Sequence, residues 1–312
     1  MFELSDAEIL PYSLQHGFWT WSAQSRIDPI PVKRAKGVYF WDVNGKRYLD
    51  FNSMTMCVNI GHGDERVIQA IVRQAQELPY AGPGMATRPR ALLGKLLASI
   101  MPGSLNRFLY TLGGQTQTRT PGIIKPPPGY LQGIREICDR YHILMIADEV
   151  MSGFGRTGRW FAVDHWGVVP DMITVAKGLT SAYAPLGAVA MTEEIAGFFS
   201  ERVYQSGLTY NAHPISLAAA AANIEVMQTD NLVERAARNG AYQRRRLVDL
   251  VKHTLRLAMF VRSGFSPPWS WYATAARGNR WRLTMAVALR WLLFVSLSSI
   301  KGFSFTPIGI LC

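Results

Sequence analysis

Residues 143–158 of this 312-residue chain read ILMIADEVMSGFGRTG. The uninterrupted apolar run from Ile143 to Ala147 predicts a strand that is buried on both faces, and Asp148 stands at its carboxyl end. Open α/β sheets bind their ligands outside that end of their strands. A helix cap or an ordinary surface acid would also explain Asp148, so the functional and the structural interpretation both stay open for this fragment.

Residues 172–179, MITVAKGL, repeat the arrangement with the opposite charge. A strand predicted from Met172 to Val175 is followed closely by Lys177 and a glycine. Burial at that point would favour the neutral amine, which is the nucleophilic form of lysine. A lysine that snorkels from the edge of the sheet fits the pattern equally well. An acid and a lysine at two strand ends of one sheet suit a cofactor that has a pyridinium nitrogen and an aldehyde.

Outward from these two segments, predicted strands alternate with predicted helices. A short, buried strand is predicted to begin at residue 108 and to stop at Gly113-Gly114. Asn44-Gly45 predicts a hairpin between 37–42 and 46–50. Apolar residues at helical spacing predict helices over residues 64–78, 89–100, 131–141, 213–227 and 232–251. This alternation predicts an α/β fold with a mostly parallel sheet covered by helices on both faces.

The composition, 48% hydrophobic and 18% charged, is that of a folded globular protein. Cys57, Cys138 and Cys312 are too few and too scattered for a disulfide framework or a metal site. The N-terminal sequence MFELSDAEIL lacks the order of a signal peptide, so a cytoplasmic location is expected. Of the net charge of +11, seven units come from residues 253–312, where no binding motif accompanies them, and we expect no nucleic-acid partner.

Residues 207–214, GLTYNAHP, precede one of the predicted helices. The hydroxyl and backbone N–H groups of this segment could hold a phosphate at the helix N-terminus. A plain capping turn uses the same residue types and remains the alternative.

Together, four segments resemble the signature of the class III pyridoxal-phosphate-dependent aminotransferases: 148–158, 170–171, 176–179 and 183–187. The segments 37–52 and 207–214 also resemble parts of that family. The resemblance implies the large domain of the fold-type-I enzymes, a homodimer, and pyridoxal 5'-phosphate as cofactor. It implies the transfer of an amino group from an amino donor to a keto-acid acceptor. Decarboxylation or racemisation on the same fold stays an alternative, because the same acid and lysine serve those reactions.

The resemblance also assigns roles to single residues. Lys177 would form the Schiff base with the cofactor aldehyde, and as a free amine it would move the proton of the reaction. Asp148 would pair with the pyridinium nitrogen and keep it protonated. Val150 would pack on one face of the ring. Thr209 would bind the cofactor phosphate across a dimer interface.

Two further assignments come from the same resemblance. Gly113 and Gly114 look like the start of the loop that holds the cofactor phosphate. Trp19 and Trp21 fall where the N-terminal segment of the family helps to line the substrate pocket.

The sequence departs from the family between Gly114 and Asp148, which only 33 residues separate. The family places there a phosphate-binding helix, an aromatic residue that stacks on the ring, and several strand–helix units, each of about 30 residues or more. We therefore expect an internal deletion between residues 114 and 122 that removes central strands of the sheet. The chain would then consist of an N-terminal segment, 1–60, an incomplete cofactor-binding domain, 61–252, and a tail.

The tail, residues 253–312, resembles nothing in the family and has no acidic residue. If the gene is read from the third base of each codon, synonymous codons allow an acidic segment there that resembles the small C-terminal domain of the family. Met259 and Trp281 limit that choice, because methionine and tryptophan have one codon each. We therefore expect a frameshifted tail. The apolar run at 283–300 contains Arg290 and is not expected to span a membrane. An inactive remnant of an aminotransferase is the alternative function.

Overall fold

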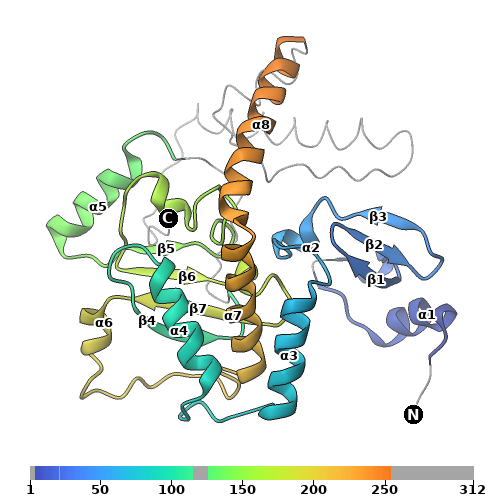
Figure 1. Ribbon diagram of the computed structural model, residues 1–312, viewed down its shortest axis with the longest axis horizontal. Coiled ribbons are helices and arrows are strands. Elements are labelled where there is room, and N and C mark those ends of the chain that lie inside the picture. Colours follow the sequence, from blue (N-terminus) through green and yellow to red (C-terminus); the bar gives the residue numbers. More distant parts are fainter. Residues whose placement is uncertain (1–3, 21, 115–125, 254–312) are drawn as a thin grey trace. The chain divides into compact units, whose positions relative to one another are not determined.

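The computed structural model of this chain describes residues 4–20, 22–114 and 126–253 (Figure 1). All of them belong to one compact unit that extends from Met1 to Ser270. Trp21, most of the segment expected to carry the deletion and nearly all of the tail lie outside the described residues. Among the helices of the described residues, none is long and apolar enough to cross a membrane.

The N-terminal part of the chain contains a three-stranded antiparallel sheet, β1-β2-β3. The helices and strands of this N-terminal part are α1 (Asp6–His16), η1 (Gln24–Arg26), β1 (Val32–Lys36), β2 (Tyr39–Asp42) and β3 (Arg47–Leu49). The predicted hairpin is confirmed, with Trp41 paired to Arg47 across the turn. Gly45 adopts a φ of +79° in this turn, where a side chain would be strained. Strand β1 adds a third strand that we did not predict.

The larger sheet has four strands in the order β4-β7-β6-β5. Their bounds are β4 (Arg107–Thr111), β5 (Ile146–Asp148), β6 (Met172–Val175) and β7 (Gly187–Met191). Strands β5 and β6 are parallel, and β7 runs antiparallel to both β6 and β4, so three of the four strands share one direction. The predicted α/β fold is confirmed, with a mixed sheet.

The described residues do not test the deletion between 114 and 122, but their strand order bears on which strands it was expected to remove. We expected it to remove central strands, but the four described strands are hydrogen-bonded to one another in an unbroken order. The strands that flank the short segment in the sequence, β4 and β5, are the two outer strands of this sheet. Missing strands would therefore extend the sheet beyond an edge and leave no hole in its middle.

The strand predicted from Ile143 to Ala147 is also partly wrong. Strand β5 begins only at Ile146, and Ile143 and Leu144 are 53% and 56% exposed. Apolar character alone therefore placed the strand too early, whereas its carboxyl end at Asp148 agrees with the prediction.

The helices predicted from apolar periodicity are confirmed to within one or two residues at each end. The helical elements of this part are α2 (Ser53–Met56), α3 (Glu65–Glu77), α4 (Arg88–Ile100), α5 (Tyr130–Tyr141), η2 (Ala162–His165), η3 (Lys177–Leu179), α6 (Glu193–Gly197), α7 (Pro214–Thr229) and α8 (Leu232–His253). Helices α3 and α4 both pack against α7 (Figure 1). The core joins Leu217 and Ile224 of α7 to Ile173 and Val175 of β6.

Candidate active site

Because strands β5 and β6 are parallel, they bring Asp148 and Lys177 to the carboxyl end of the sheet. Asp148 ends β5 and is in register with Thr174 of β6. Lys177 follows the end of β6 and begins the short helix η3. Since parallel strands end at the same side of a sheet, the acid and the lysine both lie at its carboxyl end. Of the two, Lys177 lines the cavity described next and Asp148 does not.

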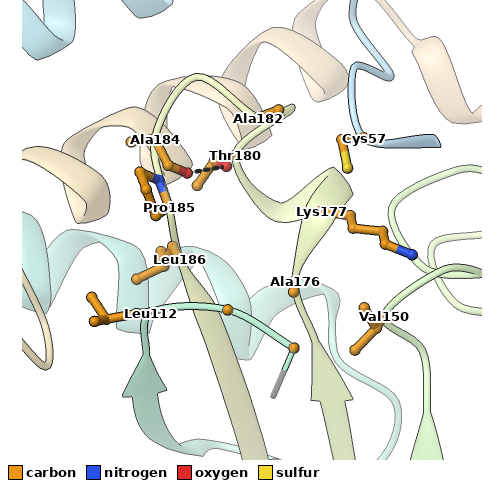
Figure 2. Close-up of a pocket in the computed structure, with 12 residues that line it drawn as sticks. Cys57, Leu112, Val150, Ala176, Lys177, Thr180, Ala182, Ala184, Pro185 and Leu186 are labelled. Carbon is orange, nitrogen blue, oxygen red and sulfur yellow. Dashed lines mark hydrogen bonds between the residues drawn. The ribbon is translucent and has the colours of Figure 1, made fainter. Parts of the chain in front are cut away.

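A cavity of about 330 Å³ opens at this edge. Figure 2 shows Lys177 and Val150 on one side of it and Leu112, Pro185 and Leu186 on the other. Segments that are far apart in the sequence thus line one cavity. The residues that line the cavity are Cys57, Leu112, Gly113, Gly114, Val150, Ala176, Lys177, Thr180, Ala182, Ala184, Pro185 and Leu186.

Gly113 and Gly114 continue strand β4 into the wall of the cavity. A Cβ on Gly114 would lie 2.9 Å from Cγ1 of Val150, which is too close for any side chain. The hydroxyl of Thr111 donates to the carbonyl oxygen of Gly113 at 3.0 Å and fixes this turn. Glycine is therefore required at 114 to let the chain approach Val150.

The two acids that follow β5 occupy different environments. Asp148 is half-buried, and its Oδ1 accepts a hydrogen bond from the backbone N–H of Val150 at 3.0 Å. Glu149 is only 2% exposed and accepts from the hydroxyl of Ser152 and, at 2.8 Å, from the N–H of Val163. Burial raises the pKa of Glu149, against the opposing effect of these hydrogen bonds. Glu149 thus ties the glycine-rich loop to the strand, and Asp148 stays closer to solvent.

Cys57 was not predicted as a site residue, yet it lines the cavity together with Lys177. Burial raises the pKa of the Cys57 thiol, and the positive charges of Lys177 and Arg156 oppose that shift. Arg156 donates to the carbonyl oxygen of Met56, and burial lowers its pKa to about 10. The sequence signal was proximity, because Cys57 lies two residues before the segment 59–63, which precedes helix α3.

The structure does not bring every predicted site residue to this cavity. Thr209 is exposed, its carbonyl oxygen accepts a hydrogen bond from the hydroxyl of Tyr80 at 2.8 Å, and it is absent from the lining of the cavity. Trp19 is half-buried near the N-terminus, where its backbone N–H donates to the side-chain oxygen of Gln24 at 3.1 Å. Trp21 lies outside the described residues.

Comparison with known proteins gives one consistent family. The family model of the class III aminotransferases matches residues 21–120 and 115–263 of this chain. The putrescine–pyruvate aminotransferase of Pseudomonas aeruginosa is 26% identical over 72% of this chain and 73% of its own length. The acetylornithine aminotransferase of Methanothermobacter thermautotrophicus is 30% identical over 69% of this chain and 74% of its own.

Among solved structures, a taurine:2-oxoglutarate aminotransferase from Bifidobacterium kashiwanohense superposes with a TM-score of 0.76 at 27% identity. The superposition covers 81% of this chain and 80% of that one, whose crystals hold pyridoxal phosphate and glutamate. The likeness therefore extends from the sequence to the arrangement of the strands and helices.

The alignments also show that relatives have residues that this chain lacks. The match to the putrescine enzyme extends over 333 residues, more than the 312 of the whole chain, although it uses only 72% of it. The two blocks of the family match meet at residues 115–120. The second block ends at residue 263, somewhat beyond Lys252, where we expected the resemblance to stop.

Proposed function

This chain belongs to the class III aminotransferase family, and from that premise we propose that Lys177 binds pyridoxal 5'-phosphate for the transfer of amino groups. The observation that supports the proposal is the carboxyl end of the parallel strands β5 and β6, where Asp148 ends β5 and Lys177 lines the cavity. Proteins that use this cofactor attach it through a lysine, and a carboxylate is one of the groups that partner its ring nitrogen.

The residues at the cavity fit the cofactor in chemistry. Gly113 and Gly114 leave backbone free of side chains at one wall, and Val150 offers an apolar surface at another. When bound, pyridoxal phosphate supplies an aldehyde that condenses with amines and a pyridinium ring that withdraws electrons. The lining around Lys177 is otherwise mostly apolar, which excludes water from the reacting atoms.

Each residue has a separate task in this proposal. The Nζ atom of Lys177 would attach the cofactor and, as a free amine, would take up and return a proton at the substrate carbon. The carboxylate of Asp148, oriented by the N–H of Val150, holds the proton on the ring nitrogen. Val150 packs on the ring, and Gly113 and Gly114 begin the phosphate loop. Thr209, exposed and away from this cavity, binds the phosphate held by a second copy of the chain in a homodimer.

Membership of the family indicates the chemical class of the substrates and not their identity. We propose an amino acid or amine as donor and a keto acid as acceptor, since two relatives named above pair putrescine with pyruvate and taurine with 2-oxoglutarate, and a third acts on acetylornithine. A cytoplasmic location, proposed on the N-terminal sequence, belongs to the same proposal. Trp19 and Trp21 remain proposed contributors to the substrate pocket.

We further propose that this chain is impaired, because relatives have residues that it lacks, and we place this loss between residues 114 and 122. The lost segment would supply the phosphate-binding helix and the aromatic residue that stacks on the ring. The proposed frameshift would remove the small C-terminal domain, which also positions the substrate. Correct positioning contributes roughly 7–11 kcal/mol in well-oriented reactions, so its loss lowers the rate by many orders of magnitude.

A turnover assay tests this proposal. We expect the purified chain, with pyridoxal phosphate, a panel of amines and either pyruvate or 2-oxoglutarate, to show no turnover above a Lys177→Ala control. Robust turnover that the Lys177→Ala control lacks would establish transamination and show that the chain is not impaired.

A further inference from the structure

The backbone of Lys177 adopts a conformation that side-chain-bearing residues rarely take. Its φ is +43°, in the left-handed region, two residues after the last residue of strand β6. For a residue other than glycine, such a conformation costs on the order of 1–3 kcal/mol and persists only where the surroundings hold it in place. The contacts of the next two residues, Gly178 and Leu179, show what holds it.

Asn223 of helix α7 contributes two of these contacts. Its side chain is 0% exposed, and its Nδ2 donates to the carbonyl oxygens of Gly178 at 2.9 Å and Leu179 at 3.0 Å. The amide thus binds consecutive peptide groups of η3. Because α7 lies in the core of the domain, this attachment joins the lysine segment to the most buried helix.

Asn59 approaches the same carbonyl from the N-terminal part of the chain. Its Nδ2 lies 3.4 Å from the carbonyl oxygen of Gly178 and 3.2 Å from that of Phe154 in the glycine-rich loop. Two side-chain amides therefore converge on the peptide that follows Lys177. The neighbouring N–H of Ile60 donates to the hydroxyl of Ser181 at 3.1 Å and holds the far end of the same turn.

Burying either of these two side-chain amides carries a free-energy cost. The Oδ1 atoms of Asn59 and Asn223 are buried without a hydrogen-bond partner among the residues that the structure describes. A buried polar atom without a partner costs about 1–3 kcal/mol. A leucine of similar size would avoid that cost, so packing alone does not favour asparagine at either position. The hydrogen bonds that Nδ2 donates are what favour asparagine there.

We propose that Asn59 and Asn223 form an amide clamp that holds the backbone of Lys177 in its left-handed conformation and so directs its amine into the cavity. They are positioning residues, since they act through the backbone of the lysine. The inference rests on the proposed function in one respect, that Lys177 is the lysine that attaches the cofactor.

The test compares Asn223→Leu and Asn59→Leu with the unchanged chain and with Gln74→Leu. Gln74 is a matched control, because it is buried and donates to the carbonyl oxygen of Leu78 at 2.9 Å, at the far end of α3. Each protein is mixed with pyridoxal phosphate and reduced with borohydride at a series of times. Peptide mapping then gives the rate of attachment at Lys177 and, as an internal reference, at the exposed Lys95.

We expect attachment at Lys177 to slow by roughly tenfold to a hundredfold in both clamp variants. Attachment at Lys95 should stay unchanged, and Gln74→Leu should match the unchanged chain at both lysines. Equal rates at Lys177 in all four proteins would overturn the clamp and leave the proposed function standing. The clamp would also fall if both lysines changed together, since that is a general loss of structure. An unchanged chain labelled at Lys95 but not at Lys177 would overturn the proposed function and the clamp with it.

Discussion

Asp148 and Glu149 are neighbours in the sequence, but the fold gives them opposite environments. The side chain of Asp148 is half-buried at the sheet edge, whereas that of Glu149 turns into the core and fastens the loop that follows. Alternation along a strand places consecutive side chains on opposite faces, so Glu149 faces the interior while Asp148 stays partly exposed. The sequence predicted the first from its position after an apolar run and contained no signal for the second.

The burial of Glu149 predicts a pH dependence of stability. Its pKa in the folded chain is raised from the ordinary value of 4.5 by burial. The folded state therefore holds this proton more tightly than the unfolded state. Its contribution to stability is full below the ordinary pKa and is lost as the pH rises through the raised, folded pKa.

We expect Glu149→Gln to remove this dependence, because glutamine does not titrate. Urea unfolding from about pH 4 to about pH 8 should show the unchanged chain losing stability relative to Glu149→Gln as the pH rises. Glu194→Gln, a change at an exposed position of α6, is the control and should run parallel to the unchanged chain. A constant difference between Glu149→Gln and the unchanged chain at every pH would contradict the prediction.

At the scale of the elements, the glycine-rich loop after β5 packs closely on helix α8. Gly158 has a φ of +83°, and a Cβ there would lie 2.8 Å from Cα of Ala237. Gly167 has a similar φ of +62°, but a Cβ on it would meet nothing within 4 Å. The two glycines therefore share the same backbone strain and differ only in the contact with α8.

Gly158→Ala should for that reason destabilise the chain more than Gly167→Ala. The added crowding at Gly158 costs about 1–3 kcal/mol beyond the strain that both variants share. The free energy of unfolding in urea measures the difference. Equal losses in the two variants would show that the loop does not rest on α8 as described.

The elements also show how much of the fold the sequence predicts. Helices such as α3 and α7 were predicted almost to the residue, because apolar spacing and end signals such as Asp64 agree. Strand β7 was not predicted, since GAVAM has small residues and no alternation. The start of β5 was misplaced because pairing with β6, and not hydrophobicity, determines where it begins.

Part of the candidate site could be predicted from the sequence and part could not. The carboxyl ends of β5 and β6 could be predicted, and with them the positions of Asp148 and Lys177 in the fold. The lining by Cys57 and the clamp by Asn59 and Asn223 could not, because these contacts join residues more than 40 positions apart in the sequence. Only tertiary packing brings them together.

For the whole molecule, the described residues form a continuous sheet with its core, although the alignments show that relatives have more residues over the same span. The sheet can lose strands beyond its edge and keep its central order. Such a loss would leave the chemistry of Lys177 and Asp148 in place and remove groups that position the cofactor.

The tail gives a prediction about the gene. We expect that restoring the reading frame near the codons for Lys252 and His253 yields an acidic C-terminus that contains a Gly-Asp-Val-Arg-like segment. Sequencing the gene through that region tests this directly. Early stop codons in the shifted frame, or the absence of such a segment, would refute the frameshift.

The central claim is that Lys177 attaches pyridoxal phosphate in the cavity at the edge of β5 and β6. The most direct measurement is borohydride reduction of the purified, cofactor-treated chain, followed by mapping of the labelled peptide. We expect a yellow protein in which reduction fixes one cofactor to Lys177, and a colourless Lys177→Ala variant. A label on another lysine, or one spread among many lysines, would contradict the claim.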